Sequence, residues 1–544
     1  MGNSSSTLPI KTVFKLSSPL PSWPPGEGFA KGTIDLGELE VCQITSFNKV
    51  WSATKGGPDN LGATFYEPSP IPEGFHLLGF YSQPNNKPLF GWALAVKDSN
   101  GSSSALAQPI DYTLIWSSAS RKVKGDGNGY IWLPTPPEGY KAAGMVVTNT
   151  PQKPPLDKVR CVRSDLTEPC EEETWIWAQK KAPTIDEADG FDIYSLRPTN
   201  RGIELPGVRV GTFTVRNSGS TITSTLACLK NVNPNKNSYM PNLEQVKALF
   251  RAYAPLIYFH PDEKFLPSSV NWYFDNGALL YQKGEDQSSK AVGIKVEEDG
   301  SNLPQGGAND GSFWLDLPVD NDAKEKVKKG DLSSAQVYLH AKPILGSTFT
   351  DIGIWLFFPF NGPARAKVGP LDIPLGKIGE HIGDWEHLTL RVSNFNGELW
   401  LLYLSQHSKG QWVEASELEF GSGNKPVAYA SLNGHALYRK PGTVMQGGGE
   451  VGIRNDTAKS KYVMDTEKGF SIVAGEYLGS AIVEPPWLNY LRKWGPRIVY
   501  DSADEVEKIQ NALPGNVKLP SEIFGEDGPT GPKLKRSWSG DEVI

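Results

Sequence analysis

The feature that most constrains the fold is an internal repeat in the first half of the chain. Trp51-Ser52 recurs 65 residues later as Trp116-Ser117, and Pro72-Glu73-Gly74-Phe75 recurs at the same offset as Pro137-Glu138-Gly139-Tyr140. Self-similarity at a fixed spacing indicates a fold built from copies of one structural unit. If the two turns are equivalent, Gly74 and Gly139 should share one backbone conformation with positive φ.

A third copy is weaker but still detectable. Trp175-Ile176-Trp177 replaces Leu114-Ile115-Trp116 at an offset of 61, and Pro206-Gly207 echoes the turn with altered spacing. Three successive β units predict a threefold closed arrangement, either β-prism-like or a small trefoil, in which closure protects the strand edges. We expect a β-repeat domain at 36–235, with units at about 45–98, 110–165 and 173–217.

The remaining sequence divides into an arm, a second domain and a tail. Residues 1–35 are rich in Ser and Pro and predict an extended arm that packs through Trp23. The second domain, 240–524, should begin with a helix at 243–253 capped by Asn242. Strand-like runs then dominate, followed by expected helices at 487–494 and 503–513 and a polar, frayed tail at 525–544. With 56 Gly and 43 Pro in 544 residues, the chain should be mainly β, its second domain a β-sandwich with a few helices.

The second domain contains the run His381-Ile382-Gly383-Asp384-Trp385-Glu386-His387, which holds two of the seven histidines of the chain. The alternation from Trp385 to Val392 predicts a strand, so Asp384 and Glu386 should share a face with Leu388. That face is apolar and should meet a core. Two acids at a core edge need compensation, which a metal ion, an arginine or a shared proton would supply.

Other histidines and acids also stand at the ends of apolar runs. We predict that His381, Asp384 and Glu386 converge on one point and that Asp262 or His260 completes the cluster. Such carboxylate and imidazole ligands favour a divalent metal, Ca²⁺ or Mg²⁺ rather than structural zinc. A further polar cluster is expected from His387, His407 and His435. The alternative is that the acids pair with Arg391 or Arg365, or accept backbone donors, and hold loops together without metal.

Charge and motif content exclude several classes of protein. The net charge of −7, without a long Lys/Arg cluster, argues against nucleic acid as a partner. No stretch has the apolar length of a membrane span, and no nucleophile elbow, Walker loop, dinucleotide fingerprint or HExxH motif is present. The start Met1-Gly2-Asn3-Ser4-Ser5-Ser6 matches the N-myristoylation pattern at Gly2. The four cysteines form no CxxC pair and fit a reducing compartment, although secretion would permit a Cys161–Cys170 bridge.

Several of these motifs together resemble the plant family related to vacuolar protein sorting-associated protein sixty-two. They are the run 379–392, the Pro-Glu-Gly-aromatic turns, Pro19 to Gly26, and Pro58-Asp59-Asn60-Leu61-Gly62. The resemblance extends from about 14 to 540. It implies a role in trafficking and supplies no catalytic residues.

A second, local resemblance concerns the central motif. His381-Ile382-Gly383-Asp384-Trp385-Glu386 is similar to the His-Arg-His-Asp-Trp-Glu core of necrosis- and ethylene-inducing-like proteins. Those are β-sandwich toxins that bind a divalent metal and plant-membrane sphingolipids. The resemblance implies that His381, Asp384 and Glu386 occupy the metal positions. This chain has Ile382-Gly383 where that family has Arg-His.

Together these observations predict a non-enzymatic, cytoplasmic and peripherally membrane-associated protein, on endosomal or vacuolar membranes, that binds lipid, glycan or protein ligands. One alternative is a membrane-acting defence or insecticidal protein whose β-repeat domain binds a receptor. Another is a metal-dependent hydrolase, for which the same cluster would be the metal site.

Overall fold

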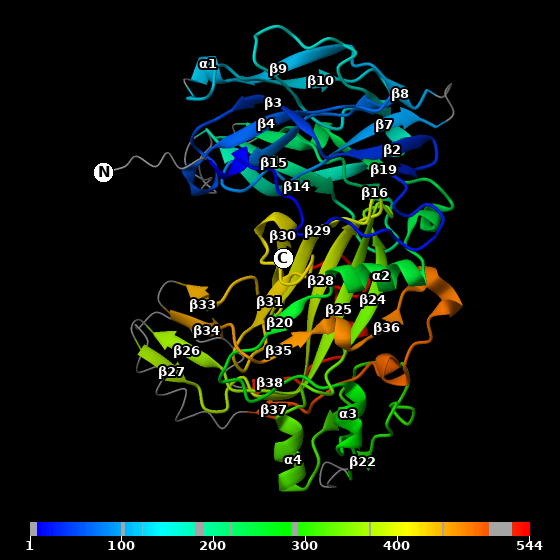
Figure 1. The fold of residues 1–544 in the computed structure, drawn as a ribbon, viewed down its shortest axis with the longest axis vertical. Helices are drawn as coiled ribbons and strands as arrows, with labels where there is room; N and C mark the ends of the chain where they lie inside the picture. The colour runs from blue at the N-terminus through cyan, green and yellow to red at the C-terminus, as the bar shows by residue number, and fades with distance from the viewer. Residues whose placement is uncertain are drawn as a thin grey trace. The chain divides into compact units, whose positions relative to one another are not determined.

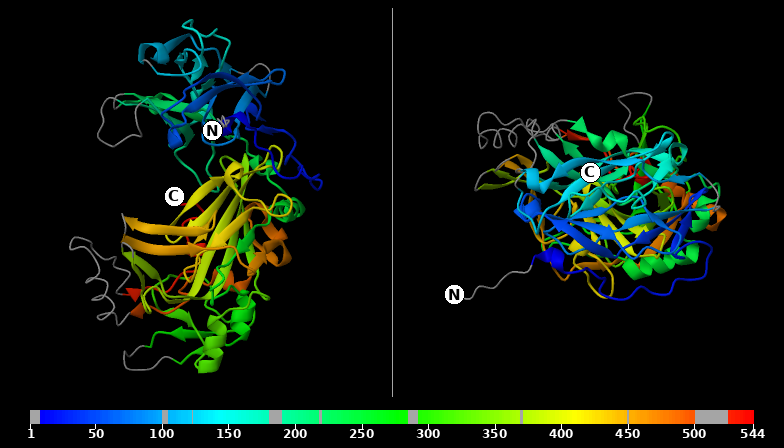
Figure 2. Two further views of the ribbon diagram at one scale, coloured as in Figure 1. Left: turned by 60° about the vertical axis from the view of Figure 1, so that its left-hand side comes forward. Right: turned by 90° about the horizontal axis from the view of Figure 1, so that it is seen from above.

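The computed structural model describes residues 8–99, 104–121, 123–179, 190–217, 220–284, 292–368, 371–448, 451–499 and 525–544. Strands dominate, as predicted (Figures 1 and 2). The chain divides into two compact units. Unit 1 comprises Met1–Gln245, Pro343–Thr350 and Val392–Glu398; unit 2 comprises Val246–Lys342, Asp351–Arg391 and Leu399–Ile544. Two short segments from the second half of the chain therefore belong to unit 1.

Unit 1 contains three sets of three antiparallel strands with the same connectivity, in which the first strand pairs with the second and the second with the third. The first two sets are separate three-stranded sheets, and the third is part of a six-stranded sheet. Their strands are β3 (Phe47–Ser52), β4 (Ala63–Pro68) and β6 (Tyr81–Pro84); β9 (Asp111–Ser117), β10 (Tyr130–Thr135) and β12 (Val146–Thr148); and β14 (Thr167–Ala178), β15 (Phe191–Pro198) and β17 (Phe213–Asn217).

Each copy also contains a short strand that pairs with the last strand of the copy. These pairs are β5 (His76–Leu77) with β7 (Ala93–Asp98), β11 (Tyr140–Lys141) with β13 (Cys161–Arg163), and β16 (Gly207–Val208) with β19 (Ala227–Lys230). Each last strand pairs in turn with the start of its own copy: β2 (Leu39–Ile44), β8 (Leu106–Ala107) and the first residues of β14. Short additional strands are β1 (Thr33–Asp35) and β18 (Ser220–Thr221), and α1 spans Ser118–Arg121. The third segment therefore has the same strand pairing as the first two.

The core of unit 1 brings the repeated tryptophans together. The ring centroids of Trp51 and Trp116 are 5.5 Å apart, and those of Trp177 lie 5.5 Å from Trp116 and 6.3 Å from Trp51. The predicted turn equivalence is confirmed, because φ is 78° at Gly74 and 80° at Gly139. The β-prism assignment itself stays a prediction.

Equivalent glycines of the first two copies also meet Thr212 of the third. A Cβ on Gly79 would lie 2.8 Å from Gly144 Cα, and a Cβ on Gly144 would lie 2.6 Å from Thr212 Cβ. We therefore expect Gly144→Ala to destabilise unit 1 by about 1–3 kcal/mol through overpacking, measured by calorimetry of the intact protein. The control is Gly434→Ala, where the added Cβ would make an ordinary contact at 3.8 Å. Equal melting temperatures for the two variants would contradict the close approach.

Unit 2 is built on a six-stranded sheet in the order β30-β29-β28-β25-β24-β36. These strands are β24 (Val337–Ile344), β25 (Phe349–Asn361), β28 (His381–Ser393), β29 (Leu399–Gln406), β30 (Lys409–Glu414) and β36 (Phe470–Ala474). A four-stranded sheet contains β20 (Leu256–Tyr258), β31 (Val427–Ala430), β32 (Leu437–Tyr438) and β35 (Val463–Asp465). Because β28 is an inner strand of the large sheet, its side chains are buried on both faces.

Smaller sheets and helices complete the unit. The sheets comprise β21 (Leu279–Gln282), β22 (Ile294–Lys295) and β23 (Phe313–Asp316); β26 (Arg365–Val368), β27 (Leu371–Pro374), β33 (Gly442–Gly448) and β34 (Val451–Thr457); and β37 (Ile498–Val499) with β38 (Gly525–Glu526). The predicted helix 243–253 is confirmed as α2 (Leu243–Tyr253), and α3 (Val270–Asp275) and α4 (Asn321–Lys328) are further helices. The helix predicted at 487–494 is only a short 3-10 turn at Pro486–Asn489, and the one at 503–513 lies outside the described residues.

Both the described part of the arm and the C-terminal tail make packing contacts. In the arm, Trp23 Nε1 donates to the carbonyl of Asn396 at 2.9 Å, as the predicted packing of Trp23 requires. The expectation of a frayed tail at 525–544 is wrong. Trp538 is only 7% exposed, and Tyr403 Oη donates to the Val543 carbonyl at 2.7 Å. The four cysteines are free thiols, so Cys161 and Cys170 form no bridge.

Candidate functional site

The central motif lies on β28, as predicted, and its polar side chains are buried. Asp384 is 8% exposed, Glu386 7% and His381 9%. The alternation of the strand places Asp384 and Glu386 on one face with Leu388, which is fully buried. The structure thus brings two carboxylates into the interior of unit 2, where each needs a partner.

Asp384 is paired with a histidine from a distant loop. His435 Nδ1 lies 3.1 Å from Asp384 Oδ2, and His435 Nε2 lies 2.9 Å from the carbonyl oxygen of Phe265. Burial alone raises the pKa of Asp384, but the hydrogen bond from His435 and the charge of His381 outweigh burial and hold this pKa below its usual value. Both ring nitrogens of His435 therefore have oxygen partners within hydrogen-bond distance.

Glu386 has the opposite electrostatic character. Burial raises its pKa well above the usual value, and the charge of Asp384 raises it further. The hydroxyl of Ser405 donates to Glu386 Oε2. The two neighbouring acids therefore differ, because Asp384 is stabilised as a carboxylate and Glu386 as a neutral acid.

The acid that the loop after β20 contributes is Glu263. Its Oε1 accepts the N–H groups of Lys264 and Phe265, both at 2.9 Å, and its Oε2 accepts the N–H of Asn433 at 2.7 Å. Glu263 Oε1 lies 4.0 Å from His435 Nε2. Glu263 therefore ties this loop to the loop that carries His435.

The residues predicted from the same loop lie elsewhere. The Asp262 side chain is 80% exposed, and the Asp262 N–H donates to His260 Nδ1 at 3.2 Å. The structure brings His435 to Asp384 and Glu263 to His435, where the sequence had suggested Asp262 or His260. The alternation of side chains along a strand does not continue into a turn. The sequence therefore could not show which of the adjacent acids Asp262 and Glu263 points inward.

The remaining predicted histidines do not form one cluster. His381 Nδ1 lies 2.9 Å from the Gly383 carbonyl oxygen, and His407 Nε2 lies 3.1 Å from Asn455 Oδ1. His387 is 2.9 Å from Glu542 Oε2 and stacks on Trp355 with centroids 4.4 Å apart. Each histidine therefore has its own structural partner.

The donor set offers limited support for a metal ion. Among the described residues, no group of three or more His, Cys, Asp or Glu side chains is arranged to hold one. Asp384 and Glu386 already have His435 and Ser405 as partners, and the charge of Lys535 lowers the pKa of both acids. The metal site stays a prediction.

The suggested arginine partners bind other acids. Arg391 makes a two-point ion pair with Asp351, both distances 2.8 Å, and a third contact of 2.8 Å with Asp541. Arg365 pairs with Asp456 at 3.2 Å. Compensation for the acids of the motif therefore comes from a histidine, a serine and a lysine. Of these partners, His435 was among the predicted site residues, but it was expected in a separate polar cluster rather than beside Asp384.

Comparison with known proteins identifies the family. The model of the family "Vacuolar protein sorting-associated protein 62" matches residues 10–542, so the chain belongs to this family and the resemblance seen in the sequence is confirmed. No curated protein matches the chain. No helix in the parts of the chain that the structure describes is both long and apolar enough to span a membrane.

Several solved structures are also similar. GNIP1Aa from Chromobacterium piscinae is 17% identical with a TM-score of 0.29, and the match covers 40% of each chain. NLPPya in complex with glucosamine is 16% identical with a TM-score of 0.20, covering 36% of this chain and 67% of that one. Necrosis and Ethylene inducing Protein 2, from the causal agent of cocoa's Witches Broom disease, is 18% identical with a TM-score of 0.17, covering 34% of this chain and 76% of that one.

Proposed function

We propose that the protein is a non-enzymatic, peripherally membrane-associated protein of vacuolar trafficking that binds its ligand through unit 2. Membership of the vacuolar sorting family supports the trafficking role. The observation that carries the non-enzymatic part is the buried network Asp384–His435–Phe265, in which each polar group already has a protein partner. A hydrolytic centre needs an open coordination position and a base that reaches substrate.

In this proposal the network supports a binding surface. Glu263 and His435 together fix the backbone of Lys264 and Phe265 through hydrogen bonds of 2.9 Å. Buried polar networks that are fully satisfied make a structure rigid. The exposed side chain of Lys264 and the half-buried side chain of Leu266 are thereby presented from a rigid loop.

The membrane role is tested with vesicles and purified full-length protein. We expect the protein to float with anionic vesicles and to leave an entrapped dye inside them. Dye release at the protein concentrations that give binding would favour the alternative, a membrane-acting defence protein. Absence of flotation with every vesicle composition would overturn the proposal.

Acylation at Gly2, which lies outside the described residues, gives a second prediction. Gly2→Ala should move the protein from the membrane fraction to the soluble fraction of cells, because it removes the acceptor of the acyl chain. Since one chain binds a membrane only marginally, the wild type should be divided between the two fractions. The control is Asn3→Ala, which should behave as wild type. An unmodified Gly2 by mass spectrometry would contradict acylation.

A further inference from the structure

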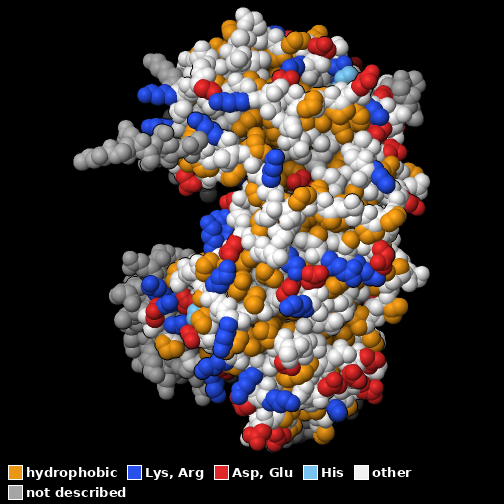
Figure 3. Space-filling model, in the orientation of Figure 1, with side chains coloured by type: hydrophobic (Ala, Val, Ile, Leu, Met, Phe, Trp, Pro, Cys, Tyr) orange, Lys and Arg blue, Asp and Glu red, His pale blue; other side chains and the backbone are white. Residues whose placement is uncertain are grey.

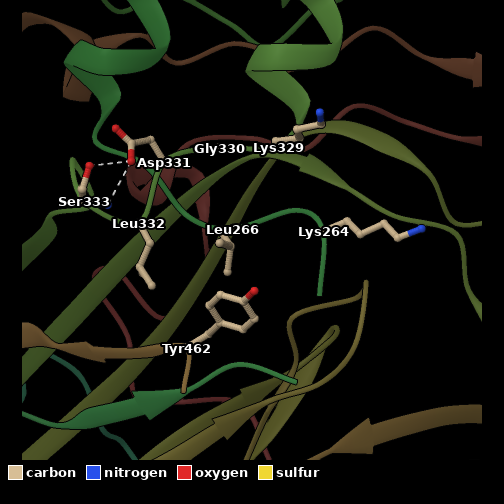
Figure 4. A pocket seen from close by; sticks show the side chains of 8 residues that line it. All are labelled: Lys264, Leu266, Lys329, Gly330, Asp331, Leu332, Ser333 and Tyr462. Atoms are coloured by element: carbon tan, nitrogen blue, oxygen red, sulfur yellow. Dashed lines mark hydrogen bonds between the residues drawn. The ribbon is translucent and has the colours of Figure 1, made fainter. Parts of the chain in front are cut away.

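A cavity of about 720 Å³ opens beside the loop that the buried network fixes. Its lining consists of Lys264, Leu266, Lys329, Gly330, Asp331, Leu332, Ser333 and Tyr462 (Figure 4). We propose that this cavity binds an anionic phospholipid, with the phosphorylated headgroup at the lysines of the rim and an apolar portion on the floor. This inference rests on the proposed function and names the ligand of unit 2.

The walls of the cavity are two chain segments that hydrogen-bond to each other. The N–H of Leu266 donates to the Lys329 carbonyl at 3.0 Å, and the N–H of Asp331 donates to the Pro267 carbonyl at 3.3 Å. Gly330 between them has φ of 63°, and a Cβ there would lie 1.8 Å from the Leu266 carbonyl oxygen. Only glycine permits this approach, so the spacing of the walls is fixed by the sequence.

The middle of the cavity is apolar. Figure 4 shows the side chains of Leu266, Leu332 and Tyr462 turned toward one another, whereas Lys264 and Lys329 extend outward from the rim. Its volume falls within the range of about 300–1,000 Å³ that is usual for ligand sites. An apolar floor with a polar rim suits a ligand that has an anionic head and an apolar body.

The rim carries more positive than negative charge, with Asp331 as the one acid of the lining. Lys264 and Lys329 are both exposed, and the structure records no ion pair for either within the described residues. Asp331 is turned to Ser333, whose N–H and Oγ donate to Asp331 Oδ1 at 3.0 and 2.6 Å. Lys461 Nζ lies 5.3 Å from the centroid of the Tyr462 ring and adds a third cation. At the end of unit 2 that carries α4, Figure 3 shows Lys and Arg side chains beside acidic ones.

These charges select the class of ligand. A phosphate monoester carries about −1.5 to −2 charges at pH 7, which two lysines can neutralise. Lysine binds phosphate as a point charge and needs no fixed geometry, so lysines on an open rim are suitable partners. The apolar floor distinguishes a lipid from a free phosphate ester, because only the lipid has an apolar portion to bury there.

The test compares wild-type protein with Lys264→Glu/Lys329→Glu in vesicle flotation. The vesicles contain phosphatidylcholine alone, with phosphatidylserine, or with a phosphatidylinositol phosphate. We expect wild type to bind the last most tightly and the double variant to bind it at least tenfold more weakly. The matched control is Lys409→Glu/Lys468→Glu, which changes the net charge equally at exposed lysines that do not line the cavity and should stay within twofold of wild type.

Two further measurements distinguish binding in the cavity from general electrostatic attraction and from binding of a soluble ligand. Tyr462→Ala leaves the charge unchanged, so weaker binding by this variant supports the cavity over general attraction to lysines. If calorimetry shows that free inositol phosphate binds, and the vesicles bind no more tightly than it does, the site belongs to a soluble ligand. That result would overturn the proposal of a lipid ligand. Unaltered melting temperatures show that the variants fold.

Failure of this inference can be distinguished from failure of the proposed function. Flotation by both the double variant and Tyr462→Ala at wild-type level would overturn the cavity as the site, while membrane association would stand. Absence of flotation by wild type itself would overturn both.

Discussion

Replacing Arg391 with Met is expected to lower the free energy of unfolding by about 3–5 kcal/mol, since removal of one partner leaves a buried charge uncompensated. Asp351 is fully buried and receives two hydrogen bonds of 2.8 Å from the guanidinium. Urea titration of the full-length protein measures the loss. The double variant Arg391→Met/Asp351→Leu should recover most of it, because well-packed apolar residues often substitute for a buried ion pair.

The loss should depend on pH. Burial raises the pKa of Asp351, and Arg391 is the main opposing influence. Without Arg391 this pKa rises further, so the folded variant retains a proton that the unfolded chain releases. Stability is then lost as pH rises through the folded pKa, and Arg391→Met should be more destabilised at pH 8 than at pH 5. The control is Arg365→Met. Arg365 is 35% exposed, and its ion pair with Asp456 should be worth less than about 1 kcal/mol. Similar losses in the two variants would contradict this account.

Asp384→Asn and Glu386→Gln are expected to change the stability of the folded protein in opposite directions, although the two acids share a face of β28. Asp384→Asn should cost about 1.5–3 kcal/mol, the range for a hydrogen bond to a charged group, because His435 loses its carboxylate partner. The pKa of Asp384 is lowered, so the stability it provides is present above the unfolded value and lost as pH falls through the folded one. The cost should therefore be fully expressed at pH 7.

Glu386→Gln should be neutral or stabilising at neutral pH. The pKa of Glu386 is raised, so its favourable contribution is present below the unfolded value and is lost as pH rises through the folded one. Glutamine mimics the neutral acid and can still accept from Ser405. The melting temperature of this variant should therefore rise relative to wild type between pH 5 and pH 8. A fall as large as that of Asp384→Asn would show that Glu386 acts as a carboxylate.

The same variants decide the metal question. A metal that binds only the folded state stabilises it by about 2.7 kcal/mol at a hundredfold excess over the dissociation constant. With a metal at this site, Ca²⁺ or Mg²⁺ raises the melting temperature of wild type, chelator reverses the rise, and both variants lose the effect. With the protein network alone, chelator leaves wild type unchanged and Asp384→Asn still destabilises.

Features encoded locally were predictable from the sequence. The repeat could be detected in the sequence because equivalent tryptophans and turn glycines occupy equivalent structural positions. Gly74 and Gly139, for example, have nearly the same φ. Asp384 and Glu386 could be predicted to share a face of β28 because alternate residues of a strand point to the same side. The pairing partners were not predictable as such, because His435 was expected in a separate polar cluster and not beside Asp384. Lys535 and Glu542 approach β28 from about 150 positions away in the sequence, and no local pattern marks such a contact.

Each unit contains contacts with residues that lie late in the sequence. These contacts can form only late in the synthesis of the chain. Unit 1 gains the contact of Trp23 with Asn396 only after the segments Val246–Lys342 and Asp351–Arg391 of unit 2 have been translated. Unit 2 lacks Trp538, Asp541 and Glu542 until the ribosome has passed residue 542. At about 5–20 residues per second, the interval between these events is on the order of ten seconds. During it Arg391 and His387 have only part of their partners, so the nascent chain presents an incomplete core for chaperones to bind.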